Sequence, residues 1–278
     1  MSDKTHLSVK ILSAIGESYA LMEGSKNLKK AINRILPKLG EASSVDRVYV
    51  FRNYYNADRE FCLTYLDEWC REGISVQMDN ENLFEVPWSI FPELEADLRA
   101  NKVKNELVKD SLNEVFKEVM TQQEIVAYLF IPILVNNEFW GFIGFDNCTR
   151  EELFAPEQVS ALHAFSKTLG NLIFAKRSYK KAVKNERKYR QIISNIQDIV
   201  FKLNENLDIT YLNGAWSKMT DRDIHECIGH PLTNFLESEG AEKLKSKIGK
   251  LESMGEKSCS VRTAFIKPDG SLYYIRIN

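Results

Sequence analysis

The stretch from Pro156 to Ile196 reads PEQVSALHAFSKTLGNLIFAKRSYKKAVKNERKYRQIISNI, and the rest of the chain is arranged on either side of it. It contains no proline after its first residue, and a proline suits the first turn of a helix, where no backbone N–H is needed. A seven-residue repeat runs through it, with eight of its ten a and d positions apolar or aromatic. The a positions are Phe165, Leu172, Tyr179, Glu186 and Ile193, and the d positions are Thr168, Ala175, Ala182, Tyr189 and Ile196. We therefore predict one long helix that begins in the core of a preceding domain and ends as a connector.

Length and composition indicate a two-domain cytoplasmic protein. A chain of 278 residues is too long for one ordinary core, and its 44% hydrophobic and 27% charged residues are typical of a globular protein. A net charge of −2 argues against nucleic-acid binding, and the longest apolar run, Ile125–Val135, is too short to cross a membrane. The first residues, MSDKTHLSVK, have no signal-peptide core, so no signal peptide is expected, and the chain contains no CxxC pair. We therefore expect free thiols of a reducing compartment at Cys62, Cys70, Cys148, Cys227 and Cys259.

The first half of the chain alternates helical and extended patterns. Helices are predicted at His6–Met22, Leu28–Leu39, Glu93–Asn101 and Asp110–Gln122, and strands at Val45–Asn53, Phe61–Trp69, Val126–Val135 and Phe139–Asp146. Asn136-Asn137 marks a hairpin between the last two strands, because asparagine tolerates a positive φ. The segment Arg71–Pro92 is a long loop that carries aromatic residues, and such loops are usually functional.

The second half has shorter elements. Strands are predicted at Ile199–Leu203, Ile209–Asn213, Ser258–Ile266 and Leu272–Ile277, and helices at Ala215–Thr220, Asp223–Ile228 and Ala241–Met254. The turn Lys267–Gly270 contains proline, aspartate and glycine, which makes the last two strands a hairpin.

Two resemblances follow from these stretches. Residues 7–176 resemble a GAF domain, the small-molecule-sensing module of bacterial signalling proteins. The stretches that carry the resemblance are VDRVYVF (45–51), EWCREGISVQMDN (68–80), VPWSIFPEL (86–94), IPILVNNEFWGFIGFDN (131–147) and FAPEQVSALHAFSKTLGNLI (154–173). The second half looks like a PAS domain, on YRQIISNIQDIVFKLNENLDITYLNGAWSKMT (189–220), CIGHPLTNF (227–235) and FIKPDGSLYYIRIN (265–278). A PAS sheet usually has one more strand after such a hairpin, so we expect the chain to be part of a longer polypeptide.

These resemblances imply an α+β protein of two sensor modules, each a central antiparallel sheet flanked by helices. The expected boundaries are 1–176 for the GAF-like domain, 177–190 for a helical connector and 191–278 for an incomplete PAS-like domain. A GAF ligand site normally lies between the sheet and the loops that cover it. We therefore expect an apolar cavity with a few polar groups. Its predicted residues are Arg47, Tyr49, Trp69, Phe84, Trp88, Phe91, Phe145 and Asp146, although these aromatic residues could equally fill a core.

Known cofactors and catalytic groups of the two families are not expected. No cysteine is followed by histidine, as bilin attachment requires, and Met120-Thr121 replaces the acidic pair of cyclic-nucleotide-binding GAF domains. In the PAS-like half, Leu232 stands where a flavin-binding sensor has cysteine, and Ala241–Met254 contains no haem-ligating histidine. No histidine pair has metal spacing, and no kinase or cyclase motif occurs. We predict no cofactor, no metal and no catalysis, with a thiol enzyme using Cys62 and Cys70 as the alternative.

The predicted function is the sensory region of a cytoplasmic bacterial signalling protein, a histidine kinase, with a diguanylate cyclase as the alternative. We expect a homodimer through the helix 156–196, with Glu186 fixing the register, and an effector domain downstream. The a and d positions of the repeat would form the contact line between the two helices of the dimer, called the seam below. Eight basic residues on this helix suggest either a nucleic-acid or membrane partner, or a solvated face around this seam. We favour the solvated face, with no nucleic-acid partner and no membrane insertion. The eight are Lys176, Arg177, Lys180, Lys181, Lys184, Arg187, Lys188 and Arg190.

Overall fold

The computed structural model describes residues 2–25, 27–254, 258 and 260–278, and the chain divides into two compact units. The first unit ends at Tyr179 and the second begins at Lys180, so the helix α5 (Pro156–Asn195) contributes to both. The prediction of a long helix at this place is confirmed, with its end one residue earlier than expected. Each unit has a hydrophobic core of its own.

The first unit is built on a six-stranded antiparallel sheet with the order β3-β2-β1-β6-β5-β4. Its strands are β1 (Arg47–Tyr55), β2 (Phe61–Cys70), β3 (Val86–Pro87), β4 (Lys104–Leu107), β5 (Ala127–Val135) and β6 (Glu138–Asn147). Asn136 and Asn137 have φ values of 53° and 63° and join β5 to β6 directly, so the predicted hairpin is confirmed. The short strands β3 and β4 were not predicted, because two to four residues show no period.

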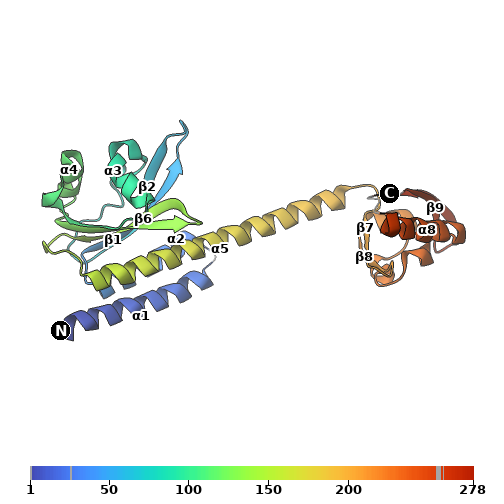
Figure 1. Ribbon diagram of the computed structural model, residues 1–278, viewed down its shortest axis with the longest axis horizontal. Helices are drawn as coiled ribbons and strands as arrows, with labels where there is room; N and C mark the ends of the chain where they lie inside the picture. The colour runs from blue at the N-terminus through green and yellow to red at the C-terminus, as the bar shows by residue number, and fades with distance from the viewer. Residues whose placement is uncertain (1, 26, 255–257, 259) are drawn as a thin grey trace. The chain divides into compact units, whose positions relative to one another are not determined.

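Helices cover both faces of this sheet (Figure 1). On one side lie α1 (Ser2–Gly24), α2 (Leu28–Ser43) and the beginning of α5, and on the other lie α3 (Pro92–Arg99) and α4 (Glu114–Gln122). Successive side chains of β1 point to opposite faces of the sheet, so this strand contributes to the cores on both sides. Val48 and Val50 pack in the α1–α2–α5 core, whereas Tyr49 and Phe51 pack in the α3–α4 core. The predicted α+β class with helices flanking an antiparallel sheet is therefore confirmed for this unit.

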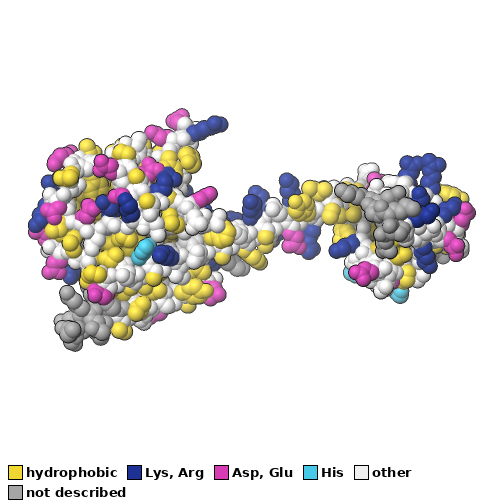
Figure 2. Space-filling view, viewed as in Figure 1, with side chains coloured by type: hydrophobic (Ala, Val, Ile, Leu, Met, Phe, Trp, Pro, Cys, Tyr) yellow, Lys and Arg dark blue, Asp and Glu magenta, His cyan; other side chains and the backbone are white. Residues whose placement is uncertain are grey.

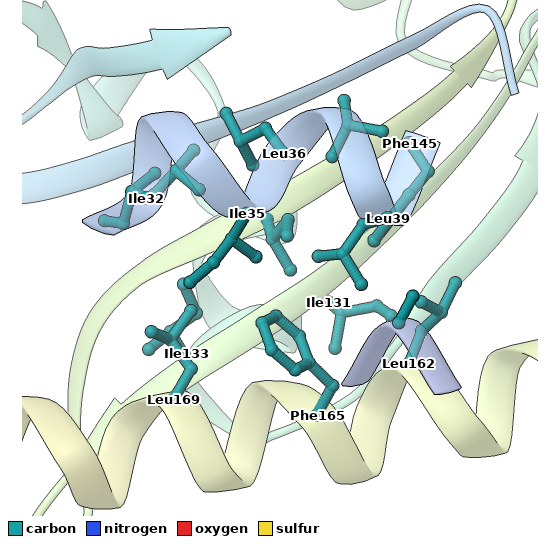
Figure 3. Packing of buried hydrophobic residues seen from close by; sticks show 14 of the residues in the cluster. Ile32, Ile35, Leu36, Leu39, Ile131, Ile133, Phe145, Leu162, Phe165 and Leu169 are labelled. Carbon is teal, nitrogen blue, oxygen red and sulfur yellow. The ribbon is translucent and has the colours of Figure 1, made fainter. Parts of the chain in front are cut away.

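The first turns of α5 are part of the core rather than an appendage. Figure 3 shows Leu162, Phe165 and Leu169 of α5 meeting side chains from α2, β5 and β6. The approach is close, because the hydroxyl of Ser166 donates a hydrogen bond to the carbonyl of Pro132 and Gly170 lies against β5. A Cβ at Gly170 would overlap the carbonyl oxygen of Leu134, which explains the glycine within this helix.

This packing limits the seam expected along α5. Phe165 is buried and Leu172 packs against the same core, so these two a positions are already used within the domain. From Ala175 onward the seam lies open, with Tyr179 75% and Tyr189 64% exposed. The expectation that the whole of residues 156–196 is available to a partner helix is therefore wrong for the part up to Leu172.

In its described residues, the second unit contains two hairpins, a short 3-10 helix (Leu232–Phe235) and three α-helices after the end of α5. The strands β7 (Phe201–Leu203) and β8 (Ile209–Leu212) pair with each other, as do β9 (Val261–Ile266) and β10 (Leu272–Ile277). The helices are α6 (Ala215–Thr220), α7 (Ile224–Cys227) and α8 (Ser238–Met254). One sheet was expected, but the described strands form two separate two-stranded sheets over a core centred on Trp216, Leu232 and Phe265. The part of the last hairpin predicted at Cys259 lies outside the described residues.

A buried asparagine ties the end of α5 to this second core. The side-chain amide of Asn213 donates hydrogen bonds to the carbonyls of Ile193 (3.3 Å) and Asp198 (2.9 Å), and its oxygen accepts one from the N–H of Val200 (2.9 Å). Only 2% of Asn213 is exposed. Because carbonyls at a helix end have no partner within the helix, Asn213 supplies what the end of α5 lacks.

Candidate functional site

A buried charge cluster centres on Arg47, at the start of β1. Its side chain is fully buried, with Nε 3.3 Å from a carboxylate oxygen of Glu68 on β2 and Nη1 3.5 Å from one of Asp146 on β6. Its Nη2 donates to the carbonyl oxygens of Ser75 (2.9 Å) and Gln123 (3.4 Å). One guanidinium thus connects three strands with the loop 71–92 and the end of α4.

The loop 71–92 is held at Glu68 as well. The backbone N–H groups of Gln77 and Met78 each donate to its carboxylate at 2.9 Å, and the hydroxyl of Tyr65 donates at 3.0 Å. Together with Arg47, these donors give the Glu68 side chain, which is 3% exposed, polar partners on several sides. The loop that was expected to be functional is therefore fastened to the sheet by charge-assisted hydrogen bonds.

Asp146 is the less well stabilised acid of the cluster. Burial raises its pKa to about 7, against the opposing effects of Arg47 and of the Tyr49 hydroxyl, which donates to it at 3.2 Å. Arg47 faces two carboxylates, so the cluster has one negative charge in excess when both are ionised. A proton on Asp146 would make the cluster neutral, and Asp146 is thus the group expected to titrate near neutral pH.

The centre of this face is filled by aromatic rings. Tyr49 stacks on Tyr65 with ring centroids 5.5 Å apart, and Phe51 stacks on Phe142 at 5.2 Å. Gly144 leaves room for the Tyr49 ring, which a Cβ there would strike. At the centre of the sheet these rings fill the place where the cavity was expected.

A recess lies instead toward the β4 edge, between α3 and α4. It has a volume of about 320 Å³, and its aromatic lining comes from Phe91, Phe116 and Tyr128. Its charged lining consists of Glu93, Asp97, Lys104, Glu106 and Asp110. In Figure 2, hydrophobic side chains lie in a hollow over α3 and α4 with acidic side chains around it.

The structure separates the eight predicted site residues. Arg47, Tyr49, Trp88 and Asp146 lie in the buried layer beneath α3 and α4, and Phe91 alone among the eight lines the recess. Trp69 and Phe145 pack in the core on the opposite face of the sheet. They alternate with Glu68 and Asp146, and a side-chain period of two places neighbours on opposite faces. Phe84 is 39% exposed on the loop.

The thiols do not form a reactive centre in the described part of the chain. Cys62, Cys70, Cys148 and Cys227 are free, and burial raises the pKa of each, to about 12 for Cys70 and Cys148. Thiolate is the nucleophilic form, so these cysteines are poor nucleophiles at neutral pH. The same described residues contain no group of three His, Cys, Asp or Glu side chains that could hold a metal ion.

The fold defines the class of protein: two α+β modules, with the helix α5 running from the first into the second. A model of the GAF domain matches residues 27–173, and a model of the PAS fold matches residues 187–278. The chain therefore belongs to the GAF domain family, with a PAS domain after the GAF domain. Both resemblances drawn from the sequence are confirmed, in the stated order.

Two curated relatives are kinases by name. The methanogenesis regulatory histidine kinase FilI of Methanothrix harundinacea (strain 6Ac) is 30% identical over 193 residues, which is 68% of this chain and 21% of that protein. Sporulation kinase C of Bacillus subtilis (strain 168) is 36% identical over 85 residues, 27% of this chain and 20% of that protein. The matched part of this chain thus spans about a fifth of the length of each relative.

Among solved structures, the phycocyanobilin-bound GAF domain from a cyanobacterial phytochrome is similar to the first unit. The TM-score is 0.51 at 15% identity, and the match covers 60% of this chain and 95% of that domain. At this identity the similarity shows the fold alone.

None of the helices in the described part of the chain combines the length and apolar character that crossing a membrane requires.

Proposed function

We propose that this chain is the sensory region of a cytoplasmic histidine kinase, in which the GAF domain receives a small molecule and α5 relays the signal. The observation that carries the proposal is the continuity of α5, which is core at Phe165 and is bound at its other end by Asn213. A change in the first core would therefore act on the helix without an intervening loop. The two kinase relatives support a kinase domain as the effector.

We further propose that two copies of the chain associate through the open part of α5. This part carries the exposed seam residues Tyr179 and Tyr189, and Ile192 is 49% exposed beside them. Glu186, at an a position, is ion-paired to Arg190 of its own helix at 2.7 Å, which reduces the cost of placing it near a partner. The remaining cations of this segment repel across a dimer, but salt screens that repulsion beyond about 8 Å.

The basic residues also have roles within the chain. Lys176 donates to the carbonyl of Ser25 at 2.6 Å, and the guanidinium of Arg177 lies 5.8 Å from the ring centroid of Trp140. The other six of these basic residues are exposed, which supports a solvated helix face.

Sedimentation equilibrium tests the association. Tyr179→Glu and Tyr189→Glu should each weaken the dimer by roughly tenfold or more, because each places a buried charge at the seam. Tyr55→Glu is the control, since Tyr55 is 69% exposed and is the last residue of β1 rather than part of α5. Leu172→Glu is unsuitable because Leu172 packs in the domain core. A wild-type chain that stays monomeric at high concentration and moderate salt would end the dimer model.

Autophosphorylation of the full-length protein tests the relay. Four residues inserted after Lys184 change the phase of the seam, whereas seven residues preserve it. We expect the four-residue insertion to change kinase output and the seven-residue insertion to leave it near the wild-type level. Equal output from both insertions and the wild type would mean that α5 is only a tether. Nucleotide cyclisation in place of autophosphorylation would instead identify the effector as a cyclase.

A further inference from the structure

We propose that the recess between α3 and α4 binds a small organic cation that carries an apolar group. This inference rests on the proposed sensory function, and it names the chemical class of the signal. The recess has about 320 Å³, near the lower end of the range of small-molecule pockets. Its occupant is therefore a compact metabolite rather than a large cofactor.

The aromatic walls favour a cation with an apolar body. Phe116 stands edge-on to Phe91 at 5.8 Å and to Tyr128 at 5.3 Å between ring centroids, so the three rings form a continuous wall. All three rings line the recess, and an aromatic ring attracts a positive charge placed over its face. At the mouth, Leu112 is 98% exposed, and an apolar group of the ligand would cover it.

The charges around the recess exclude anions. Four carboxylates and one ammonium group line it, those of Glu93, Asp97, Glu106, Asp110 and Lys104. Lys104 lies between two of the acids, 2.7 Å from Glu106 and 3.3 Å from Asp97, so a positive charge is already held at the base. An anionic ligand would meet like charges on several sides, and such juxtapositions select against it.

Two of the four acids remain for a ligand. Asp97 is paired with Lys102 and Lys104, and Glu106 is paired with Lys104 and accepts a 2.7 Å hydrogen bond from Tyr128. Among the described residues, Glu93 and Asp110 line the recess without any ion pair. We assign the ligand's charge to these two carboxylates and its apolar group to the space between the rings and Leu112.

Nuclear magnetic resonance titration of the ¹⁵N-labelled 278-residue chain tests the proposal with three probes of similar shape. These are phenethylammonium (cation), 2-phenylethanol (neutral) and phenylacetate (anion). Phenethylammonium should give saturable shifts at residues 91–97 and 104–116, with 2-phenylethanol binding about tenfold more weakly and phenylacetate not at all. Equal binding of the three probes, or no saturable shift by about 10 mM phenethylammonium, would overturn the proposal.

Variants separate charge from shape. The double variant Glu93→Gln/Asp110→Asn should weaken phenethylammonium about threefold to tenfold and leave 2-phenylethanol unchanged. Glu72→Gln, which removes an acid outside the recess, should leave all three affinities unchanged. A double variant that binds phenethylammonium as tightly as the wild type would refute the assignment of the charge. The dimer and insertion experiments do not involve a ligand, so failure here leaves the relay model standing and failure there leaves this site standing.

Discussion

Replacement of Arg47 by methionine should destabilise the first unit in a strongly pH-dependent way. Methionine fills a similar volume but leaves Glu68 and Asp146 buried without their shared cation. Removal of one partner of a buried ion pair costs about 3–5 kcal/mol, and we expect this loss at pH 8. At pH 5 Asp146, whose pKa is already about 7 in the wild type, takes up a proton. The loss there should be smaller by about 1–2 kcal/mol, because Glu68 keeps its backbone donors.

Urea unfolding followed by tryptophan fluorescence measures this difference. Trp69, Trp88 and Trp140 lie in the first unit and Trp216 in the second, so a Trp216→Phe background confines the signal to the first unit. The variants Arg47→Met and Arg47→Met/Asp146→Asn are compared at both pH values. The double variant removes the excess charge and should recover part of the loss at pH 8.

Two results would refute this reasoning about the charge cluster. A loss below about 1 kcal/mol at pH 8 would mean that water or rearrangement compensates the two carboxylates. A loss of equal size at pH 5 and pH 8 would mean that Asp146 does not titrate in this interval, and that the effect of Arg47→Met comes from packing alone.

Three further predictions concern single positions. Because folding raises the pKa of Asp146 from 3.8 to about 7, the native state binds the Asp146 proton more tightly, and the free energy of unfolding should fall as the pH rises from 5 to 8. Asp146→Asn should flatten this pH dependence in unfolding measurements, and an unchanged dependence would mean that another group causes it. Gly170→Ala should cost at least about 2 kcal/mol through overlap with Leu134, whereas Gly16→Ala, in open space on α1, should gain about 0.5–1 kcal/mol; the same sign in both urea curves would contradict the close approach. Asn213→Ala should lower the stability of the second unit by about 2–3 kcal/mol and speed hydrogen exchange after Ile193; unchanged exchange would show that the end of α5 does not need this cap.

The sequence predicted the elements with a sustained period and missed those without one. The helix α5 and the β5–β6 hairpin were predicted well, because a seven-residue repeat and an Asn-Asn turn are local signals. The strands β3 and β4 are too short to show alternation, and β4 contributes Lys104 and Glu106 to the recess. The recess could therefore not be found from the sequence.

The sequence could not tell which of the predicted site residues share one face of the sheet. Apolar residues occupy both faces of β6, so alternation could not say whether Phe145 or Asp146 points toward the loop. Glu68 was overlooked for a similar reason, although it is the acidic neighbour of Trp69 on a strand beside Arg47. Charged residues within three adjacent predicted strands were the available signal, since a buried charge is rarely left without a partner.

The close seating of α5 on β5 sets a rule for building chimaeric receptors from this protein. Up to Arg177 the helix is a wall of its own domain, fastened by Ser166, Gly170 and the contact of Arg177 with Trp140. A fusion joint placed before Arg177 would replace part of the α5 segment that packs on the GAF domain, and would leave that domain's core incompletely covered. A joint between Tyr179 and Ile193 would exchange whole receptors, provided that the number of residues between the two domains changes only by multiples of seven.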